Sequence, residues 1–268
     1  MKRKLTLFVT NDCNLNCSHC YLYLKKDYFN FNTYMEIINQ GWDEVTFTGG
    51  EALLHPYIWN MIHIAHRKNI SIRLLTNGIL LDEKNIHELK RNNVQLFISY
   101  DKSRQYILEK INLAVQNNLK VGINHVLTEE ERFILNNLPE EIDSICLIYP
   151  THHDNAIIPI YDSLKWNELL SQALSDYIKF IDKIIYEPAF INKNEYENME
   201  VSCLSEICTT VNVFGERVIC CLLLDAQKYQ FNDIKDCPVL NKQAILALNG
   251  TVAICPLLLR YSGNKEIW

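Results

Sequence analysis

The chain has 268 residues, of which 48% are hydrophobic and 22% charged, an ordinary composition for a globular protein that can bury a large core. Its 26 basic and 32 acidic residues give a net charge of −6, and no run of Lys and Arg is longer than Lys2-Arg3-Lys4. The charges therefore indicate neither nucleic acid nor an anionic membrane surface as a partner. The apolar run at residues 5–10 is too short for a signal peptide, and no run approaches a membrane span. We therefore expect a cytoplasmic protein.

Strand-like and helix-like segments alternate from residue 4 to about residue 190. Short β-rich runs predict strands at residues 5–10, 45–48, 70–75, 94–99, 121–126, 145–149 and 184–186. Apolar residues at helical spacing predict helices over residues 108–115 and 169–181. The pair Asn77-Gly78 predicts a turn after the third strand.

The repeated β–α units predict a parallel sheet with helices packed outside it, because each crossover returns the chain to the same edge of the sheet. Six such units are fewer than the eight that close a barrel of the usual kind. We therefore predict an α/β fold, a partial (β/α)6 barrel, with its chemistry at the carboxyl ends of the strands.

The pattern changes after a polar stretch at residues 192–200, and we predict two domains, at residues 1–190 and 191–268. The second region repeats a unit in which a glycine turn lies between two cysteines: Cys203, Gly215 and Cys220 first, then Cys237, Gly250 and Cys255. Each glycine is flanked by β-rich runs, and Asn249-Gly250 is a strong hairpin signal. The repeat predicts two tandem β-hairpins in a small cysteine-rich domain.

The chain has ten cysteines, and nine of them fall into two groups, three within residues 13–20 and six within residues 203–255. A disulfide scaffold is one interpretation, but such scaffolds are usually short secreted chains, and a cytosolic chain keeps its thiols reduced. The clustering therefore favours metal or iron–sulfur ligation.

The first group, Cys13, Cys17 and Cys20, comes directly after the first predicted strand. Three cysteines leave one iron of a [4Fe–4S] cluster free for another ligand, and that iron can chelate the amino and carboxylate groups of S-adenosylmethionine (SAM). A zinc site is the alternative and would need a fourth ligand such as His19, whose place within the same loop would strain a tetrahedral site.

The run from Cys13 to Tyr21, Cys-Asn-Leu-Asn-Cys-Ser-His-Cys-Tyr, resembles the signature of the radical SAM superfamily, and the resemblance extends over residues 4 to about 190. In that family the second strand ends in a Gly-Gly-Glu type motif that binds the SAM amino group, and this chain has Gly49, Gly50 and Glu51 there. Glycine lets a backbone approach a ligand closely, and a carboxylate suits an ammonium group. A plain turn is the alternative for this motif.

Three further residues are candidate SAM contacts. His19 stands where the family usually has an aromatic residue against adenine, which is a departure from the pattern, although an imidazole can also stack. Ser99 ends the fourth strand and is expected at the ribose or carboxylate, and Asn124 on the fifth strand is a further candidate. A solvated turn is the alternative for polar residues at strand ends.

The second cysteine group resembles the auxiliary-cluster extensions called SPASM, or in shorter form twitch, that follow many radical SAM cores, although it lacks the dense cysteine run of the full pattern. Six cysteines are too few for two fully ligated [4Fe–4S] clusters, so one auxiliary cluster is expected. Its expected ligands are Cys203, Cys220, Cys237 and Cys255, with Cys208 or Cys221 as alternates, and zinc is the alternative metal.

The remaining candidate residues lie within or after the last two predicted strands. Tyr149, His152, His153, Asp154 and Glu187 follow the last two predicted strands, where they either serve a substrate as acid or base or form a solvated loop. Cys146 lies within an apolar strand and is expected to be a core thiol.

The resemblance implies an enzyme that cleaves SAM to a 5′-deoxyadenosyl radical and then modifies a substrate by hydrogen abstraction. Peptide maturation is the first expectation, and a small-molecule dehydrogenase or rearrangement enzyme of natural-product or cofactor biosynthesis is the alternative. An electron donor such as flavodoxin or ferredoxin is implied. Peptide maturation would also need a separate leader-peptide recognition protein or a leaderless docking mode, because the first strand begins near residue 4.

Overall fold

The computed structural model describes residues 3–20, 22, 24–100, 106–128, 138–148, 163–186, 190–192, 208–211, 213–215, 217–218, 247–248 and 251–253. Seven parallel strands form the main sheet in chain order: β1 (Lys4–Thr10), β2 (Glu44–Gly49), β3 (Ser71–Thr76), β4 (Val94–Tyr100), β5 (Val121–Val126), β6 (Ser144–Ile148) and β7 (Ile184–Tyr186). All seven predicted strands are confirmed, with ends that differ by one residue or less.

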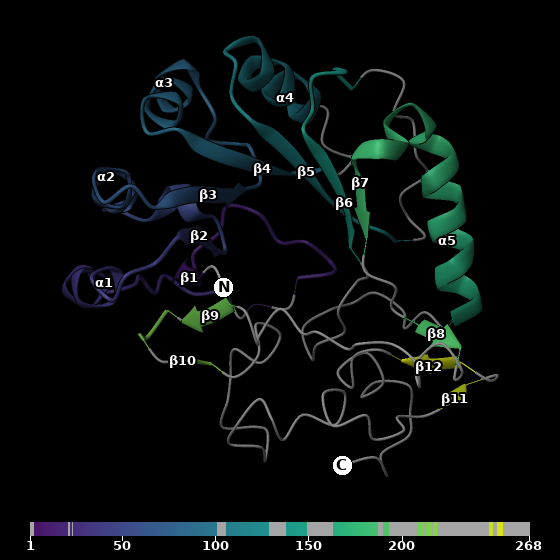
Figure 1. Cartoon of the computed structure of the whole chain (residues 1–268), viewed down its shortest axis with the longest axis horizontal. Coiled ribbons are helices and arrows are strands. Elements are labelled where there is room, and N and C mark those ends of the chain that lie inside the picture. Colours follow the sequence, from purple (N-terminus) through teal and green to yellow (C-terminus); the bar gives the residue numbers. More distant parts are fainter. Residues whose placement is uncertain are drawn as a thin grey trace.

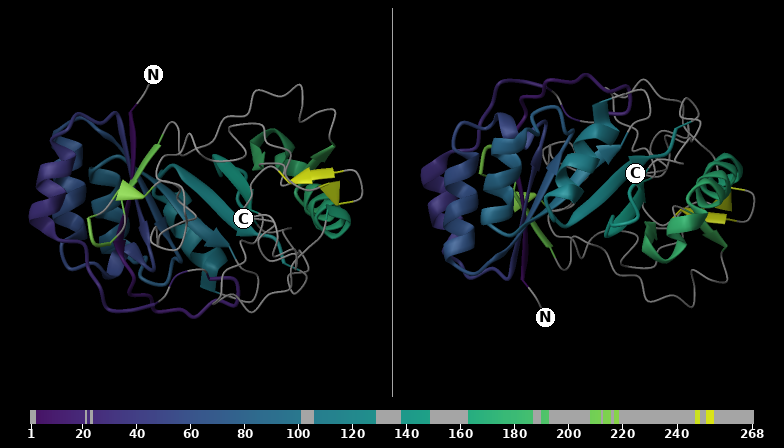
Figure 2. Two further views of the ribbon diagram at one scale, coloured as in Figure 1. Left: turned by 90° about the horizontal axis from the view of Figure 1, so that it is seen from below. Right: turned by 90° about the horizontal axis from the view of Figure 1, so that it is seen from above.

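The helices follow the strands as the β–α pattern predicts: α1 (Phe31–Ile38), α2 (Ile58–Arg67), α3 (Glu83–Arg91), α4 (Tyr106–Gln116) and α5 (Ser163–Asp176), with short 3₁₀ helices at Ala52–Leu54 and Ile178–Lys183. Side chains cap α1 and α3: Asn30 accepts from backbone N–H groups in the first turn of α1, and Asp82 accepts from Asn85 N in α3. Helices α1–α4 line the outside of the curved sheet, and α5 lies beyond β7 (Figures 1 and 2).

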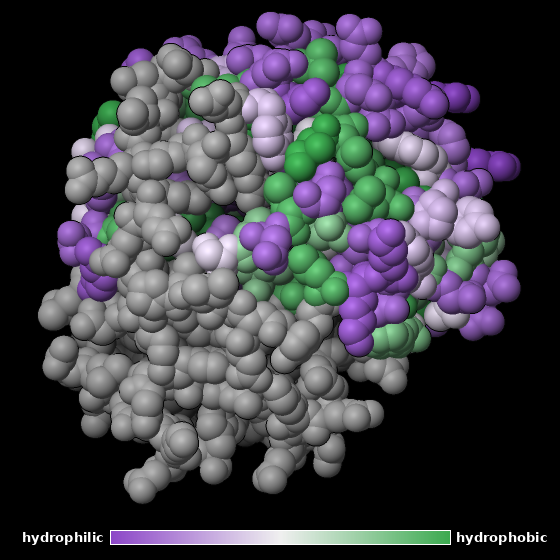
Figure 3. Space-filling model, turned by 180° about the vertical axis from the view of Figure 1, so that it is seen from behind, coloured by the Kyte–Doolittle hydropathy of each residue, from purple (hydrophilic) through white to green (hydrophobic). Residues whose placement is uncertain are grey.

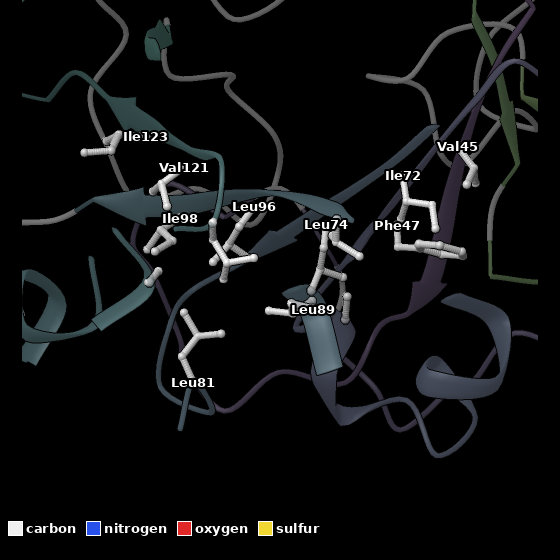
Figure 4. Close-up of a cluster of buried hydrophobic side chains, with 14 of the residues drawn as sticks. Val45, Phe47, Ile72, Leu74, Leu81, Leu89, Leu96, Ile98, Val121 and Ile123 are labelled. Carbon is white, nitrogen blue, oxygen red and sulfur yellow. The ribbon is translucent and has the colours of Figure 1, made fainter. Parts of the chain in front are cut away.

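The core lies between the sheet and these helices. Alternate residues of β2–β5 point into it, among them Phe47, Leu74, Leu96 and Ile123, and they gather with Leu89 of α3 (Figure 4). The opposite face of each strand is therefore turned away from the helices, and we call this the inner face of the barrel. No helix among the described residues is long and apolar enough to cross a bilayer. Seen from behind, the coloured part of the surface has a group of apolar side chains bordered by hydrophilic ones (Figure 3).

The sheet is open and extends beyond β1. Strand β9 (Cys208–Val211) pairs parallel with β1, so that Lys4 faces Cys208 and Leu7 faces Val211. Strand β10 (Arg217–Val218) pairs antiparallel with β9 around Gly215, whose φ of 86° is a conformation that glycine adopts without strain. The edges of the sheet are therefore β10 and β7, and a segment of the predicted cysteine-rich region continues the barrel sheet.

The remaining strands form a small separate sheet. Strand β11 (Ala247–Leu248) pairs antiparallel with β12 (Thr251–Ala253), as the Asn249-Gly250 signal predicts, and β12 pairs with β8 (Phe190–Asn192). The cysteine-rich domain as a whole, with the boundary at residue 190, stays a prediction.

The long helix predicted over residues 169–181 is wrong beyond Asp176. Helix α5 ends at Asp176, and the next residue, Tyr177, is buried and shares a 2.8 Å hydrogen bond with the Nδ1 atom of His125 on β5. A 3₁₀ helix follows from Ile178. The apolar residues Ile178 and Ile181 that extended the helical pattern are exposed. The helical spacing of these two residues was misleading, because the helix ends at the buried hydrogen bond between Tyr177 and His125.

The expectation of a core thiol at Cys146 is also wrong. Its neighbours Ile145 and Leu147 belong to the helix-side core, so strand alternation turns Cys146 to the inner face, where it is half-buried. Burial raises the pKa of the Cys146 thiol, and the positive charge of Arg73 acts in the opposite sense.

Candidate functional site

The cysteine loop follows β1 at the carboxyl edge of the sheet. Its two ends are joined because Asn11 N donates to Asp27 O and Lys25 N donates to Asn11 O, both at 3.1 Å. Within the loop, Cys20 N donates to Cys17 O at 3.1 Å, which forms a turn between these two cysteines. The structure thus places Cys13, Cys17 and Cys20 on one closed loop directly after β1, and their binding of a cluster stays a prediction.

The three cysteines are not in disulfides and are half-buried, and His19 on the same loop is also half-buried. Among the described residues, no three Cys, His, Asp or Glu side chains converge on a point where one ion would bind. A [4Fe–4S] cluster does not require such a point, because each cysteine binds a different iron. Three soft sulfur donors on one loop therefore fit a cluster with one open iron.

Burial favours the protonated form of two cysteines of the loop, Cys13 and Cys20. Burial raises the pKa of Cys13, the backbone hydrogen bond from Leu15 opposes this, and the charges of Glu51, Cys17 and Cys20 raise it further. Burial also raises the pKa of Cys20. Because thiolates are the metal ligands, cluster binding must displace these protons.

The glycine turn after β2 packs directly against the cysteine loop. Gly50 N donates to Thr10 O and Glu51 N donates to Asp12 O, both at 2.8 Å. A Cβ atom on Gly49 would lie 2.2 Å from Thr10 O, and one on Gly50 would lie 2.2 Å from Asp12 O and 3.1 Å from Cys13 Cβ. The glycines are thus required by the close approach of the protein's own backbone.

The Glu51 carboxylate is fully buried and faces protein donors. Its Oε1 atom accepts from Leu53 N at 3.0 Å and from Thr76 Oγ1 at 2.8 Å, and its Oε2 atom accepts from Asn77 N at 2.7 Å. Burial raises the pKa of Glu51, and these hydrogen bonds act in the opposite sense. The carboxylate therefore ties the end of β2 to the end of β3, while its contact with SAM stays a prediction.

Ser99 and Asn124 form a row on the inner face. They are partners in the β4–β5 register, and Asn124 is in turn the partner of Cys146 on β6. All three residues are half-buried. The structure therefore places both predicted SAM contacts side by side near the carboxyl ends of their strands, with a thiol beside them that the sequence had assigned to the core.

One site residue was missed by the sequence reasoning. Asn77, noted only for its turn, is buried after β3, and its Nδ2 atom lies 2.7 Å from Asn14 Oδ1 and 3.9 Å from Cys13 Sγ. Its position after a parallel strand, at the same edge as the cysteine loop, was the available signal.

Of the other candidate residues, the structure describes Cys208 alone, whose backbone begins β9 opposite Lys4. The residues outside the described part of the chain are Tyr149, His152, His153, Asp154, Glu187, Cys203, Cys220, Cys221, Cys237 and Cys255. Lys4 is the first residue of β1, so the backbone of Cys208 lies at the end of the sheet opposite the cysteine loop.

The chain is similar in sequence and in fold to known proteins. A GTP 3',8-cyclase of Clostridium perfringens (strain SM101) is 28% identical, over 71% of this chain and 66% of the relative. The Radical SAM cyclopropyl synthase TigE of Paramaledivibacter caminithermalis is 26% identical, over 50% of this chain and 37% of the relative. The chain thus spans less than two thirds of the length of these relatives.

The fold is similar to that of Streptococcus suis SuiB bound to its precursor peptide SuiA, with a TM-score of 0.67 at 16% identity, covering 90% of this chain and 64% of that one. Residues 7–131 match the family model described as the Radical SAM superfamily. These residues include the cysteine loop, the glycine turn and the strands β2–β5 complete. This part of the chain is therefore similar in sequence to the Radical SAM superfamily, and the parallel barrel to which it belongs has a fold similar to that of SuiB.

Proposed function

We propose that this protein is a radical SAM enzyme in which Cys13, Cys17 and Cys20 hold a [4Fe–4S] cluster. When bound, the cluster supplies the electron that cleaves SAM to a 5′-deoxyadenosyl radical, which abstracts hydrogen from the substrate. The observation that carries the proposal is the packing of the three-thiol loop against the Gly49-Gly50 turn at the carboxyl edge of a parallel barrel.

The residues of the chain position these groups. The backbone bonds at Gly50 and Glu51 fix the cysteine loop, and Glu51 ties that turn to β3. Ser99 and Asn124 offer a hydroxyl and an amide from the inner face, which suits hydrogen bonds to the ribose or carboxylate of SAM. His19 lies on the loop itself, where its ring can stack on adenine.

The test is the triple variant Cys13→Ala, Cys17→Ala, Cys20→Ala. With dithionite as reductant, the reconstituted wild-type protein should produce 5′-deoxyadenosine from SAM, and the triple variant should produce none. A variant of the half-buried inner-face thiol, Cys146→Ala, is the matched control and should keep its iron and its cleavage of SAM. Cleavage that survives the triple change would refute the proposal.

For the substrate we propose peptide maturation, with residues 191–268 as a domain that holds one auxiliary cluster through Cys203, Cys220, Cys237 and Cys255. The support is the cysteine–glycine repeat of the tail, and a PqqA peptide cyclase of Gluconobacter oxydans is also among the relatives. Flavodoxin or ferredoxin would supply the electron, and a separate protein would recognise the leader peptide.

A small-molecule substrate is the second candidate, favoured by the match to the GTP 3',8-cyclase of Clostridium perfringens. The two candidates differ in what stimulates SAM cleavage. Added GTP should raise 5′-deoxyadenosine formation above the substrate-free rate if the second is correct, whereas a short peptide encoded beside the gene should do so if the first is correct.

A further inference from the structure

Asn77 is held in one orientation. It is buried, its backbone N–H donates to Glu51, and its Oδ1 atom accepts a 3.0 Å hydrogen bond from Ile79 N. Because Oδ1 is occupied by a backbone donor, the amide cannot exchange the places of its oxygen and nitrogen without losing that bond. The Nδ2 group must therefore point away from Ile79, toward the cysteine loop.

The Nδ2 group carries two hydrogens and has two acceptors in reach. Asn14 Oδ1 lies at 2.7 Å and Cys13 Sγ at 3.9 Å. A neutral thiol is a weak acceptor, whereas a sulfur that carries negative charge is a much better one. The Asn77 amide is thus in position to donate a hydrogen bond to the Cys13 sulfur once that sulfur has lost its proton and bound iron.

The negative charge near Cys13 gives a hydrogen-bond donor to its sulfur a stabilising role. The buried carboxylate of Glu51 lies near enough for its charge to act on the thiol, and a further negative charge beside it is unfavourable. The backbone N–H of Asn77 donates to Glu51, and its side-chain amide faces the Cys13 sulfur. Asn77 therefore offers one neutral donor to each of the two anionic groups.

We propose that the side-chain amide of Asn77 donates a hydrogen bond to the Cys13 sulfur and thereby raises the reduction potential of the cluster that Cys13 helps to hold. This inference rests on the proposed function. The cluster takes up one electron from a donor such as flavodoxin or ferredoxin, and Asn77 neither gains nor loses a proton. A hydrogen bond to a ligand sulfur stabilises the reduced form, which carries the extra negative charge.

The test compares Asn77→Leu and Asn77→Asp with wild-type protein, each fully reconstituted. Asp keeps the acceptor for Ile79 N but loses the donor, and Leu loses both without adding charge. The potential is measured by titration followed by electron paramagnetic resonance, on the signal that is absent from the Cys13, Cys17 and Cys20 triple variant. The equilibrium constant for reduction should fall about tenfold in Asn77→Leu, which is about 59 mV for one electron, and at least as far in Asn77→Asp.

Asn92→Asp is the matched control. Asn92 is buried and its Nδ2 donates to Glu88 O at 2.7 Å on the outer side of the barrel, so this variant should keep the wild-type potential. A second readout separates the potential from general damage: SAM cleavage driven by titanium(III) citrate should be unchanged in Asn77→Leu, while cleavage driven by flavodoxin should fall about tenfold.

An unchanged potential in both Asn77 variants with full iron content would overturn the inference and leave the proposed function standing. If wild-type protein binds no cluster at the loop, the proposed function itself fails. If both variants lose the cluster, a different protein tests the inference: an Asn14→Ala variant labelled with ¹⁵N in its asparagine amides. Its reduced cluster should show a ¹⁵N hyperfine coupling. The absence of this coupling would overturn the inference.

Discussion

Ser99 and Asn124 are direct partners in the register of β4 and β5, and both are half-buried on the inner face. Partners across parallel strands stand close enough to contact the same ligand. We therefore predict that Ser99→Ala and Asn124→Ala each weaken SAM binding about 2- to 13-fold, the range for a neutral hydrogen bond of about 0.5–1.5 kcal/mol. The double variant should deviate from additivity because the two residues are neighbours. Equilibrium binding of SAM to the reconstituted protein measures both effects.

Ser144→Ala is the control for this pair. Ser144 lies on the neighbouring strand β6, and its hydroxyl is buried with no hydrogen-bond partner among the described residues. Its removal should leave SAM affinity unchanged. Unchanged affinity in Asn124→Ala as well would show that the row does not contact SAM.

Glu51→Gln should destabilise the protein itself. The glutamine amide group must face at least one of the donors that the carboxylate now accepts, Leu53 N, Thr76 Oγ1 or Asn77 N. Each lost bond to a charged group costs about 1.5–3 kcal/mol of the free energy of unfolding. Urea unfolding measures this loss, and Glu141→Gln, at an exposed position, should cost nothing comparable. Equal stabilities would show that the Glu51 bonds do not hold the two strand ends together.

The sequence predicted the strand series because the β-branched and apolar runs of β1–β7 are buried on the helix side and bounded by turns. It also predicted the cysteine loop and the glycine turn as one site. It could not predict the reason for the glycines, since the close approach of Gly50 to Asp12 O joins residues far apart in the chain.

Other features depend on tertiary contacts that leave no local signal. The pairing of β9 with β1 needs a partner about 200 residues away, and the helix end at Tyr177 depends on a hydrogen bond to His125. The side chain of Asn77 was missed for a related reason: an Asn-Gly pair predicts a turn equally well whether or not its amide reaches a cysteine.

A pH effect is expected from His55, which is buried against the loop that follows the cysteines. Its Nε2–H donates to Phe29 O at 3.0 Å, and its Nδ1 accepts from Tyr57 N at 3.1 Å, so the ring is held neutral. Burial lowers the pKa of His55, and the bond to Phe29 acts in the opposite sense. Tyr28 and Tyr57 are the titratable side chains whose rings contact it.

Since the pKa of His55 is lower in the folded protein than its unfolded value of about 6.5, the unfolded chain takes up the proton first as the pH falls. The stability contribution is complete above about pH 6.5 and is lost as the pH falls toward and through the folded pKa, by at most about 1.4 kcal/mol per pH unit. Urea unfolding at several pH values from 7.5 to 5.5 should show this slope, and His55→Gln should flatten it. The exposed His87→Gln should keep it.

The last prediction concerns the cysteines of the tail. If Cys203, Cys220, Cys237 and Cys255 hold one [4Fe–4S] cluster, the reconstituted protein should contain about eight irons, and the Cys13, Cys17 and Cys20 triple variant should keep about four. Changing Cys220 or Cys255 should remove the tail's share of iron while SAM cleavage continues, because cleavage needs only the open iron at the first loop. Product formation on the true substrate should nevertheless fall, since an electron acceptor or substrate anchor is lost. A triple variant that contains one zinc and no iron would instead identify the tail as a structural metal site, and it would remove the support that the tail gives to peptide maturation.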